Sequence, residues 1–138
     1  QGEKEDGNDS NQDGDALSEV ELLHNCVFLL NAGHETTTNL IGNALISLQE
    51  WPKQHEQLKA DLHAATTDED RDRIMGLAVD EFLRFESSNQ LGNRRALQAT
   101  QVNGVELPAG ALLTLCIGAA NRDPAVFAQP DTLTLDPP

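Results

Sequence analysis

The feature that most restricts the fold is a long proline-free stretch that begins at a helix-capping signal. Ser18 and Glu21 form an SxxE capping box, in which two side chains satisfy backbone amide groups left free at a helix start. Apolar residues then recur at helical spacing as far as Leu48, with few charges between them. A continuous helix from Glu19 to about Leu48 would be roughly 45 Å long at ~1.5 Å per residue. Its uncharged middle predicts burial on all sides, as at the centre of a domain larger than 138 residues.

Residues 1–15 have a different composition, with six acidic residues, one lysine, three glycines and no apolar side chain. Such a segment cannot bury enough surface to offset the entropy cost of ordering. The sequence therefore predicts an acidic flexible leader over 1–15, followed by one partial domain over 16–138.

Two further helices are predicted after the long one. Pro52 suits the first turn of a second helix that continues to about His63. A third helix is expected over about Arg71–Glu86, because apolar residues recur there at helical spacing. Its predicted inner face consists of Ile74, Leu77, Ala78, Phe82 and Leu83.

A small antiparallel β part is predicted from Arg94 onward, where the apolar period becomes strand-like. The expected strands cover residues 96–102, 105–107 and 111–119, with turns at Asn103-Gly104 and at 108–110. Asp123 and Pro124 supply a cap and a first residue for one more short helix. The predicted fold class is mainly α with a small antiparallel β part (α+β).

The charge balance limits the possible partners. The net charge is −14, which argues against nucleic acid and against anionic membrane surfaces. The longest apolar run, Cys26–Leu30, is far too short to cross a bilayer, so we expect a cytoplasmic protein. Cys26 and Cys116 have no CxxC spacing and no histidine at metal-ligand spacing, which predicts two reduced, packed thiols and no metal site.

The sequence AGHETT at 32–37 is unusual inside a helix. A threonine hydroxyl there can donate to the carbonyl four residues back, so Thr36 is expected to reach Ala32. Gly33 leaves no side chain in the gap, which predicts a loosened, grooved turn with a hydroxyl and the Glu35 carboxylate beside it. Alternatively, the helix merely tolerates the threonines and packs Gly33 against a neighbour.

A second pattern is ExxR, formed by Glu81 and Arg84. Residues at i and i+3 share a helix face, and the planar guanidinium suits a two-point contact with a carboxylate. Surface helices often carry such pairs, and each contributes little. The neighbouring Phe82 and Leu83, predicted to face inward, place this pair near the core.

These motifs occur in one order along the chain: AGHETT, ExxR, the basic pair Arg94-Arg95, PAG at 108–110 and ANRDP at 120–124. The set resembles the haem-thiolate cytochrome P450 family in its soluble bacterial form, over about residues 14–136. The resemblance implies a partial fold of that family, from its long central helix to just before the loop that carries the cysteine ligand of the haem iron.

The resemblance also implies roles for individual residues. Ala32 and Gly33 match the family's oxygen-binding groove, and Glu35 and Thr36 match its acid and alcohol pair for proton delivery, a catalytic role. The other matches are a structural ion pair, Glu81 and Arg84, and a cation for a haem propionate, Arg94. The cofactor would be haem, the substrate a small organic molecule, and the electron donor a ferredoxin or a flavoprotein.

Two departures from the family pattern stand out. The third member of the ion-pair network, often arginine, is expected where this chain has Thr132. No cysteine lies in a glycine-rich loop of the family's kind, since Cys116 is in a predicted strand and Cys26 in the long helix.

Two interpretations of different class follow. In the first, the chain is a fragment of a monooxygenase, inactive alone because the iron ligand and the amino-terminal half are missing. In the second, it is a haem-free helical association module. In both, apolar side chains of the long helix should be exposed and should favour a homodimer, namely Leu22, Leu23, Val27, Phe28, Leu40 and Ile41.

Overall fold

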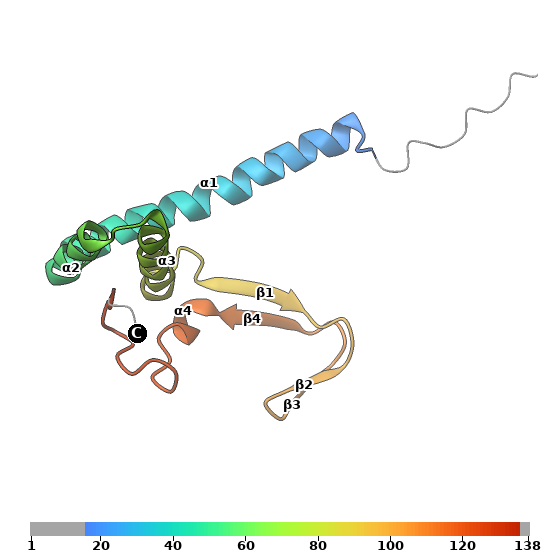
Figure 1. Cartoon of the computed structure of the whole chain (residues 1–138). Coiled ribbons are helices and arrows are strands. Elements are labelled where there is room, and N and C mark those ends of the chain that lie inside the picture. Colours follow the sequence, from blue (N-terminus) through green and yellow to red (C-terminus); the bar gives the residue numbers. More distant parts are fainter. Residues whose placement is uncertain (1–15, 136–138) are drawn as a thin grey trace, which may run out of the picture. The chain divides into compact units, whose positions relative to one another are not determined.

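The structure is a computed structural model that describes residues 16–135, so the predicted leader at 1–15 lies outside the described residues. Within these residues, four helices and four short strands follow one another (Figure 1): α1 Glu19–Glu50, α2 Pro52–Ala64, α3 Asp68–Phe85, β1 Leu91–Arg95, β2 Thr100–Val102, β3 Val105–Leu107, β4 Leu112–Cys116 and α4 Ile117–Ala120. The predicted α+β class is confirmed. Residues 16–34 and residues 35–135 belong to two compact units, which are described separately.

The first unit contains the amino-terminal half of α1. The predicted capping box is present, because the Ser18 amide donates to Glu21 Oε2 at 2.9 Å and the Glu21 amide donates to Ser18 Oγ at 3.3 Å. Every side chain from residue 16 to residue 34 is exposed, and Phe28 is 66% exposed. The predicted burial on all sides is therefore wrong for residues 16–34. The other expectation, that this chain exposes the apolar side chains of the long helix, is confirmed there.

The second unit begins with the carboxyl-terminal half of α1, which does contribute to a core. Leu40, Ala44 and Leu48 are partly buried against it, at helical spacing. The prediction that Leu40 is exposed is thus wrong, whereas Ile41 is 57% exposed as expected. Leu40 packs against the core together with Ala44, which lies four residues later on the same side of the helix.

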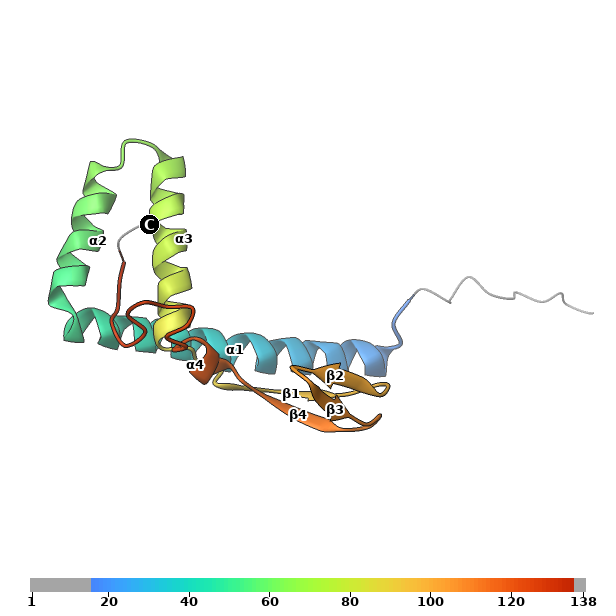
Figure 2. The same cartoon turned by 90° about the horizontal axis from the view of Figure 1, so that it is seen from below.

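The core of the second unit lies among α2, α3 and the carboxyl-terminal segment, which runs beside both helices in Figure 2. Its buried apolar residues are Leu58, Ala78, Phe82, Phe85, Leu133 and Leu135. Trp51 meets Phe85 edge to face, with ring centroids 5.8 Å apart. The prediction that Leu83 faces inward is wrong, since it is 40% exposed. Positions 78, 82 and 85 share one face of α3, so Phe85 occupies the place assigned to Leu83.

Helix α3 begins three residues earlier than predicted because Thr67 caps it. The Asp70 amide donates to Thr67 Oγ1 at 3.1 Å, and the Thr67 hydroxyl donates to Asp70 Oδ2 at 2.7 Å. Acidic residues at 68, 69 and 70 occupy the first turn, where the helix dipole favours negative charge.

The strands form two separate antiparallel pairs. In the first, β1 pairs with β4, with Leu91 opposite Cys116 and Arg95 opposite Leu112. In the second, β2 pairs with β3 through the predicted Asn103-Gly104 turn, where both residues have positive φ, 48° and 82°. Strand β1 was not predicted, because Gly92 and Asn93 have weak β propensity. Of the strand predicted at 96–102, only residues 100–102 are in a strand.

The segment after β4 also differs from the prediction. Residues 117–119, predicted as strand, belong to α4. The short helix predicted after Asp123 is a single turn instead, in which the Asp123 carbonyl accepts from the amides of Val126 and Phe127. The Asp123 side chain caps this turn by accepting from the Ala125 amide at 2.8 Å. The chain then continues without regular structure to residue 135, beside α3.

Candidate functional site

Four predicted site residues lie on α1, which stays α-helical through the AGHETT stretch. Ala32, Gly33, Glu35 and Thr36 are all exposed. The predicted loosened turn does not appear as a change of helix type, because the backbone pattern is uninterrupted from residue 19 to residue 50. The predicted bond from the Thr36 hydroxyl to the Ala32 carbonyl stays a prediction.

Gly33 bears on one of the two interpretations of that stretch. A Cβ atom added at Gly33 would meet no atom within 4 Å, so no described residue packs against this glycine. The grooved turn stays a prediction.

Glu81 and Arg84 form a two-point ion pair on α3. Arg84 Nε donates to Glu81 Oε2 and Arg84 Nη2 donates to Glu81 Oε1, each at 2.7 Å. Only 11% of the arginine side chain and 15% of the glutamate side chain are exposed. The hydrogen bond that Arg84 donates to Glu81 raises the pKa of Arg84 above its ordinary value, so the guanidinium stays charged.

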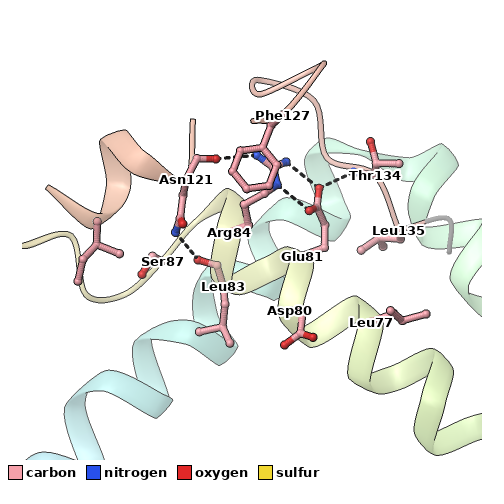
Figure 3. A pocket seen from close by; sticks show the side chains of 11 residues that line it. Leu77, Asp80, Glu81, Leu83, Arg84, Ser87, Asn121, Phe127, Thr134 and Leu135 are labelled. Carbon is pink, nitrogen blue, oxygen red and sulfur yellow. Dashed lines mark hydrogen bonds and ion pairs between the residues drawn. The ribbon is translucent and has the colours of Figure 1, made fainter. Parts of the chain in front are cut away.

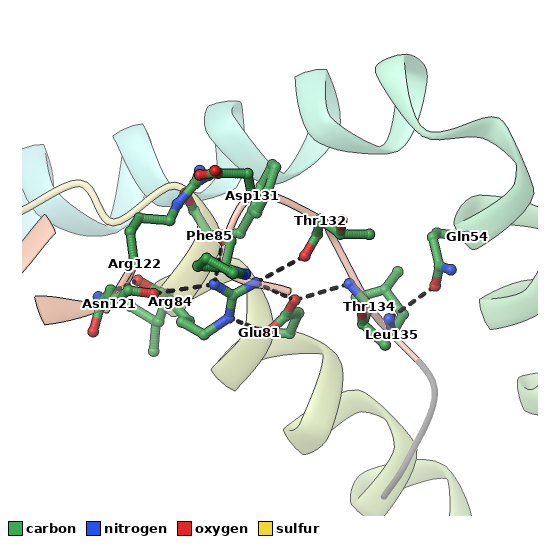
Figure 4. A network of polar contacts seen from close by, with 12 residues as sticks. Gln54, Glu81, Arg84, Phe85, Asn121, Arg122, Asp131, Thr132, Thr134 and Leu135 are labelled. Carbon is green, nitrogen blue, oxygen red and sulfur yellow. Dashed lines mark hydrogen bonds and ion pairs between the residues drawn. The ribbon is translucent and has the colours of Figure 1, made fainter. Parts of the chain in front are cut away.

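Three backbone carbonyls complete the surroundings of Arg84. Nη1 donates to the oxygens of Asn121 at 3.1 Å and Pro130 at 2.9 Å, and Nη2 donates to Thr132 at 2.9 Å. Together with the two bonds to Glu81, these contacts use all five N–H groups of the guanidinium. Figure 4 shows them converging on Arg84.

The network continues from Glu81 into the carboxyl-terminal segment. Glu81 Oε1 accepts from the Thr134 amide at 2.8 Å, and Gln54 Oε1 on α2 accepts from the Leu135 amide at 2.8 Å. Among the described residues, no buried side-chain nitrogen or oxygen lacks a partner. The family's third charged residue, absent at Thr132, is therefore not needed to satisfy either member of the pair.

Arg122 is a site residue that sequence reasoning missed. It donates from Nη2 to the Phe85 carbonyl at 2.6 Å and from Nη1 to Asp131 Oδ1 at 2.9 Å. Its guanidinium carbon also lies over the Phe85 ring, 4.2 Å from the centroid. The signal was present, since Arg122 belongs to the ANRDP motif and is one of few cations in an acidic chain.

A cavity of about 740 Å³ lies beside the ion pair. Figure 3 shows Phe127 beside the Arg84 guanidinium at its wall, with Leu83 and Leu77 farther along α3. Its lining is Leu77, Asp80, Glu81, Leu83, Arg84, Ser87, Ile117, Asn121, Phe127, Thr134 and Leu135. Six of these eleven residues are polar or charged, but apolar atoms make up most of the exposed wall, so the space suits hydrophobic side chains better than a charged ligand.

Arg94 lies on β1, opposite Leu113 of β4, and is exposed. It donates from Nη1 to the neighbouring Asn93 carbonyl at 2.8 Å, which leaves most of its N–H groups able to contact an anion. The basic pair thus lies on a strand, and Arg95 makes a longer contact of 3.4 Å with the Gly110 carbonyl.

Both thiols are free, but the prediction that they are packed is wrong. Cys26 on α1 and Cys116 at the end of β4 are exposed, because described residues cover neither of those surfaces. Within residues 16–135, no group of three histidine, cysteine or acidic side chains could hold a metal ion. No helix in that range combines the length and the apolar character needed to cross a bilayer.

One described residue has the chemistry that a haem propionate requires. In the second unit, Arg94 offers an exposed guanidinium of the kind that binds carboxylates. Neither Cys26 nor Cys116 lies in a glycine-rich loop, so neither is assigned as the iron ligand.

Two features characterise this chain. One is the largely buried pair of Glu81 and Arg84 on α3, and the other is the long helix α1 with its AGHETT stretch. Residues 3–136 match the protein family described as Cytochrome P450. The chain belongs to the cytochrome P450 family, as the order of its motifs predicted.

Individual relatives agree with this assignment. The chain is 43% identical over 124 residues to the protein named cytochrome P450 133B1 of Xylella fastidiosa, covering 90% of this chain and 28% of that protein. It is 39% identical to the vitamin D(3) 25-hydroxylase of Pseudonocardia autotrophica, covering 91% of this chain and 29% of that enzyme.

A solved structure is similar as well. P450BioI, in complex with an acyl carrier protein that carries hexadec-9Z-enoic acid, superposes with a TM-score of 0.75 at 38% identity. The alignment covers 88% of this chain and 29% of P450BioI. The chain therefore spans less than a third of the length of the relatives it matches.

Proposed function

We propose that this chain forms part of a haem-thiolate monooxygenase, which inserts one oxygen atom from dioxygen into a small organic substrate. The observation that supports the proposal is membership of the cytochrome P450 family over residues 3–136. One relative is a vitamin D(3) hydroxylase, and another has been solved in complex with a lipid-bearing carrier protein. An apolar organic substrate is therefore the class we expect.

Haem, when bound, supplies the oxidising chemistry, and a thiolate ligand makes that chemistry possible. This chain's residues supply binding and protons. Gly33, next to Ala32, would leave room beside α1 for dioxygen, and Arg94 would pair with a haem propionate. The Glu35 carboxylate takes protons from solvent, since it is exposed, and the Thr36 hydroxyl donates a proton toward dioxygen while accepting one in return.

The test uses the full-length enzyme that contains this segment. Thr36→Ala and Glu35→Gln should raise the fraction of electrons lost as hydrogen peroxide, while the substrate dissociation constant stays within about twofold, because each variant removes a proton route and no binding group. Thr38→Ala, which changes an exposed threonine on the same helix, is the matched control. Unchanged peroxide release in both variants would remove these residues from the mechanism.

The structural role of Glu81 and Arg84 is part of the same proposal. Their half-buried pair ties α3 to the segment 121–134 through backbone contacts, so it would hold the scaffold that a bound haem needs. The electron donor is proposed to be a ferredoxin or a flavoprotein. Reduction of the full-length enzyme by each donor, followed by stopped-flow absorbance, distinguishes them.

A second candidate, association without haem, is favoured by the exposed apolar residues on α1. They include Leu22, Leu23, Val27, Phe28 and Ile41, each more than half exposed. The expected product is a homodimer of the 138-residue chain. Light scattering at micromolar concentration with a parallel haem titration separates the candidates. A monomeric mass would exclude the association, and a thiolate-type carbon monoxide spectrum would exclude the haem-free module.

A further inference from the structure

Position 132 contributes to the ion-pair network only through its backbone. The Thr132 carbonyl accepts from Arg84 at 2.9 Å, as do the carbonyls of Asn121 and Pro130 at 3.1 Å and 2.9 Å. All three acceptors lie outside helices and strands. Residues in such a loop are not held in place by helix or strand hydrogen bonds. Other contacts must therefore fix the three carbonyls where Arg84 can donate to all of them.

Arg122 contacts the immediate neighbours of these three acceptors. It follows Asn121 directly, and its partner Asp131 lies between Pro130 and Thr132. Its other contacts, to the Phe85 carbonyl at 2.6 Å and to Glu86 Oε1 at 3.4 Å, join the loop to the carboxyl-terminal end of α3. One guanidinium thus holds both ends of the loop against the helix that carries Arg84.

Aromatic rings complete the arrangement. The Arg84 guanidinium carbon lies 5.1 Å from the centroid of the Phe127 ring and 5.7 Å from that of Phe85, and Arg122 lies 4.2 Å from Phe85. Ring and cation therefore alternate in the order Phe127, Arg84, Phe85, Arg122. Glu81 pairs with the guanidinium of Arg84, and Asp131 pairs with that of Arg122. These two negative charges limit the repulsion between the two arginines.

We infer that Arg122 is a positioning residue for the Glu81–Arg84 pair, because it holds the loop whose carbonyls surround Arg84. The contact with Phe85 carries most of this effect. Asp131 is 86% exposed, so water screens its ion pair with Arg122, whose side chain is only 28% exposed.

The test measures local order in the 138-residue chain by NMR. Arg122→Gln should speed solvent exchange of the Thr134 amide and of the Arg84 Nε–H by about tenfold or more, as loss of a hydrogen bond to a charged group predicts. The amide of Leu58, in the core on α2, should keep its exchange rate. Arg122→Lys should restore part of the protection, because it keeps the charge over the ring and loses the planar fork.

Two controls keep the result interpretable. Thr132→Ala should leave both exchange rates unchanged, since only the backbone of that residue is used. Asp131→Asn should change them by less than about threefold, because its ion pair is exposed. If Arg122→Gln does not fold, the same rates in Arg122→Lys decide the question. Equal acceleration at Leu58 and Thr134, or none at Thr134, would overturn the inference.

Discussion

Arg122 contacts Phe85 twice, through the ring and through the backbone. Its guanidinium carbon lies 4.2 Å from the ring centroid, and its Nη2 donates to the carbonyl of the same residue at 2.6 Å. That carbonyl belongs to the last turn of α3, where helix acceptors have no partner within the helix. The arginine therefore serves as a carboxyl-terminal cap contributed by a distant loop.

The half-buried ion pair should dominate the stability of the second unit. Arg84→Ala leaves the Glu81 carboxylate mostly buried without its cation, and we expect a loss of about 3–5 kcal/mol in the free energy of unfolding. Arg71→Ala is the matched control, because it breaks an i, i+3 pair with Asp68 that is largely exposed and should cost at most about 1 kcal/mol. Urea denaturation measures both, and equal losses would show that burial does not matter here.

The Thr67 cap should contribute measurably to α3. Thr67→Ala removes the acceptor of the Asp70 amide and should lower the free energy of unfolding by about 1 kcal/mol. Thr66→Ala, one residue earlier and also exposed, should have an effect below about 0.5 kcal/mol. Thermal unfolding followed by circular dichroism compares them. Indistinguishable midpoints would mean that the helix start does not depend on this cap.

The capping box at Ser18 should make the start of α1 sensitive to pH. Hydrogen bonds from the Ser18 amide and then from its hydroxyl lower the pKa of Glu21 below its ordinary value of 4.5. Because the folded pKa is the lower one, the cap's contribution is complete above the ordinary pKa and is lost as pH falls through the folded pKa. An NMR titration of the Glu21 carboxyl should show this lowered pKa, and Ser18→Ala should bring it back toward 4.5. An unshifted wild-type value would contradict the cap.

Two glycines should respond in opposite ways to alanine. Gly104 has φ of 82° in the β2–β3 turn, so Gly104→Ala should destabilise by about 1 kcal/mol or more. Gly33 lies in α1 with open space around it, so Gly33→Ala should stabilise the helix by up to about 1 kcal/mol. In the full-length enzyme the same Gly33→Ala change should weaken dioxygen binding, because the added methyl group would occupy the proposed groove. Helix content and unfolding curves test the first two effects.

The parts of the fold that the sequence predicted are those set by local signals. Ser18 and Glu21 mark a helix start, Pro52 starts the next helix, and Asn103-Gly104 forms a hairpin, because each acts on residues within four positions. The strand at 91–95 was missed because its pairing partner lies some twenty residues away and its own propensity is low. Leu83 was assigned inward on a pattern that Phe85 fits equally well.

In the candidate site, too, the contact between residues close in sequence was predicted and the contacts between distant residues were missed. The i, i+3 spacing of Glu81 and Arg84 predicts their contact directly. The backbone acceptors at 121, 130 and 132 carry no side-chain signal, so no sequence pattern reveals them. Arg122 belongs to a recognised motif, but its partners Phe85 and Asp131 become its neighbours only through the folding of the loop.

The burial of Leu133 and Leu135 has a consequence for synthesis on the ribosome. Both leucines complete the core between α2 and α3, yet they are translated about fifty residues after the end of α3. Until that segment leaves the exit tunnel, Phe82 and Phe85 lack the apolar cover that these two leucines provide, although Trp51 has already been made and can lie against Phe85. The nascent α2–α3 hairpin is therefore the point at which a chaperone that binds apolar segments would act.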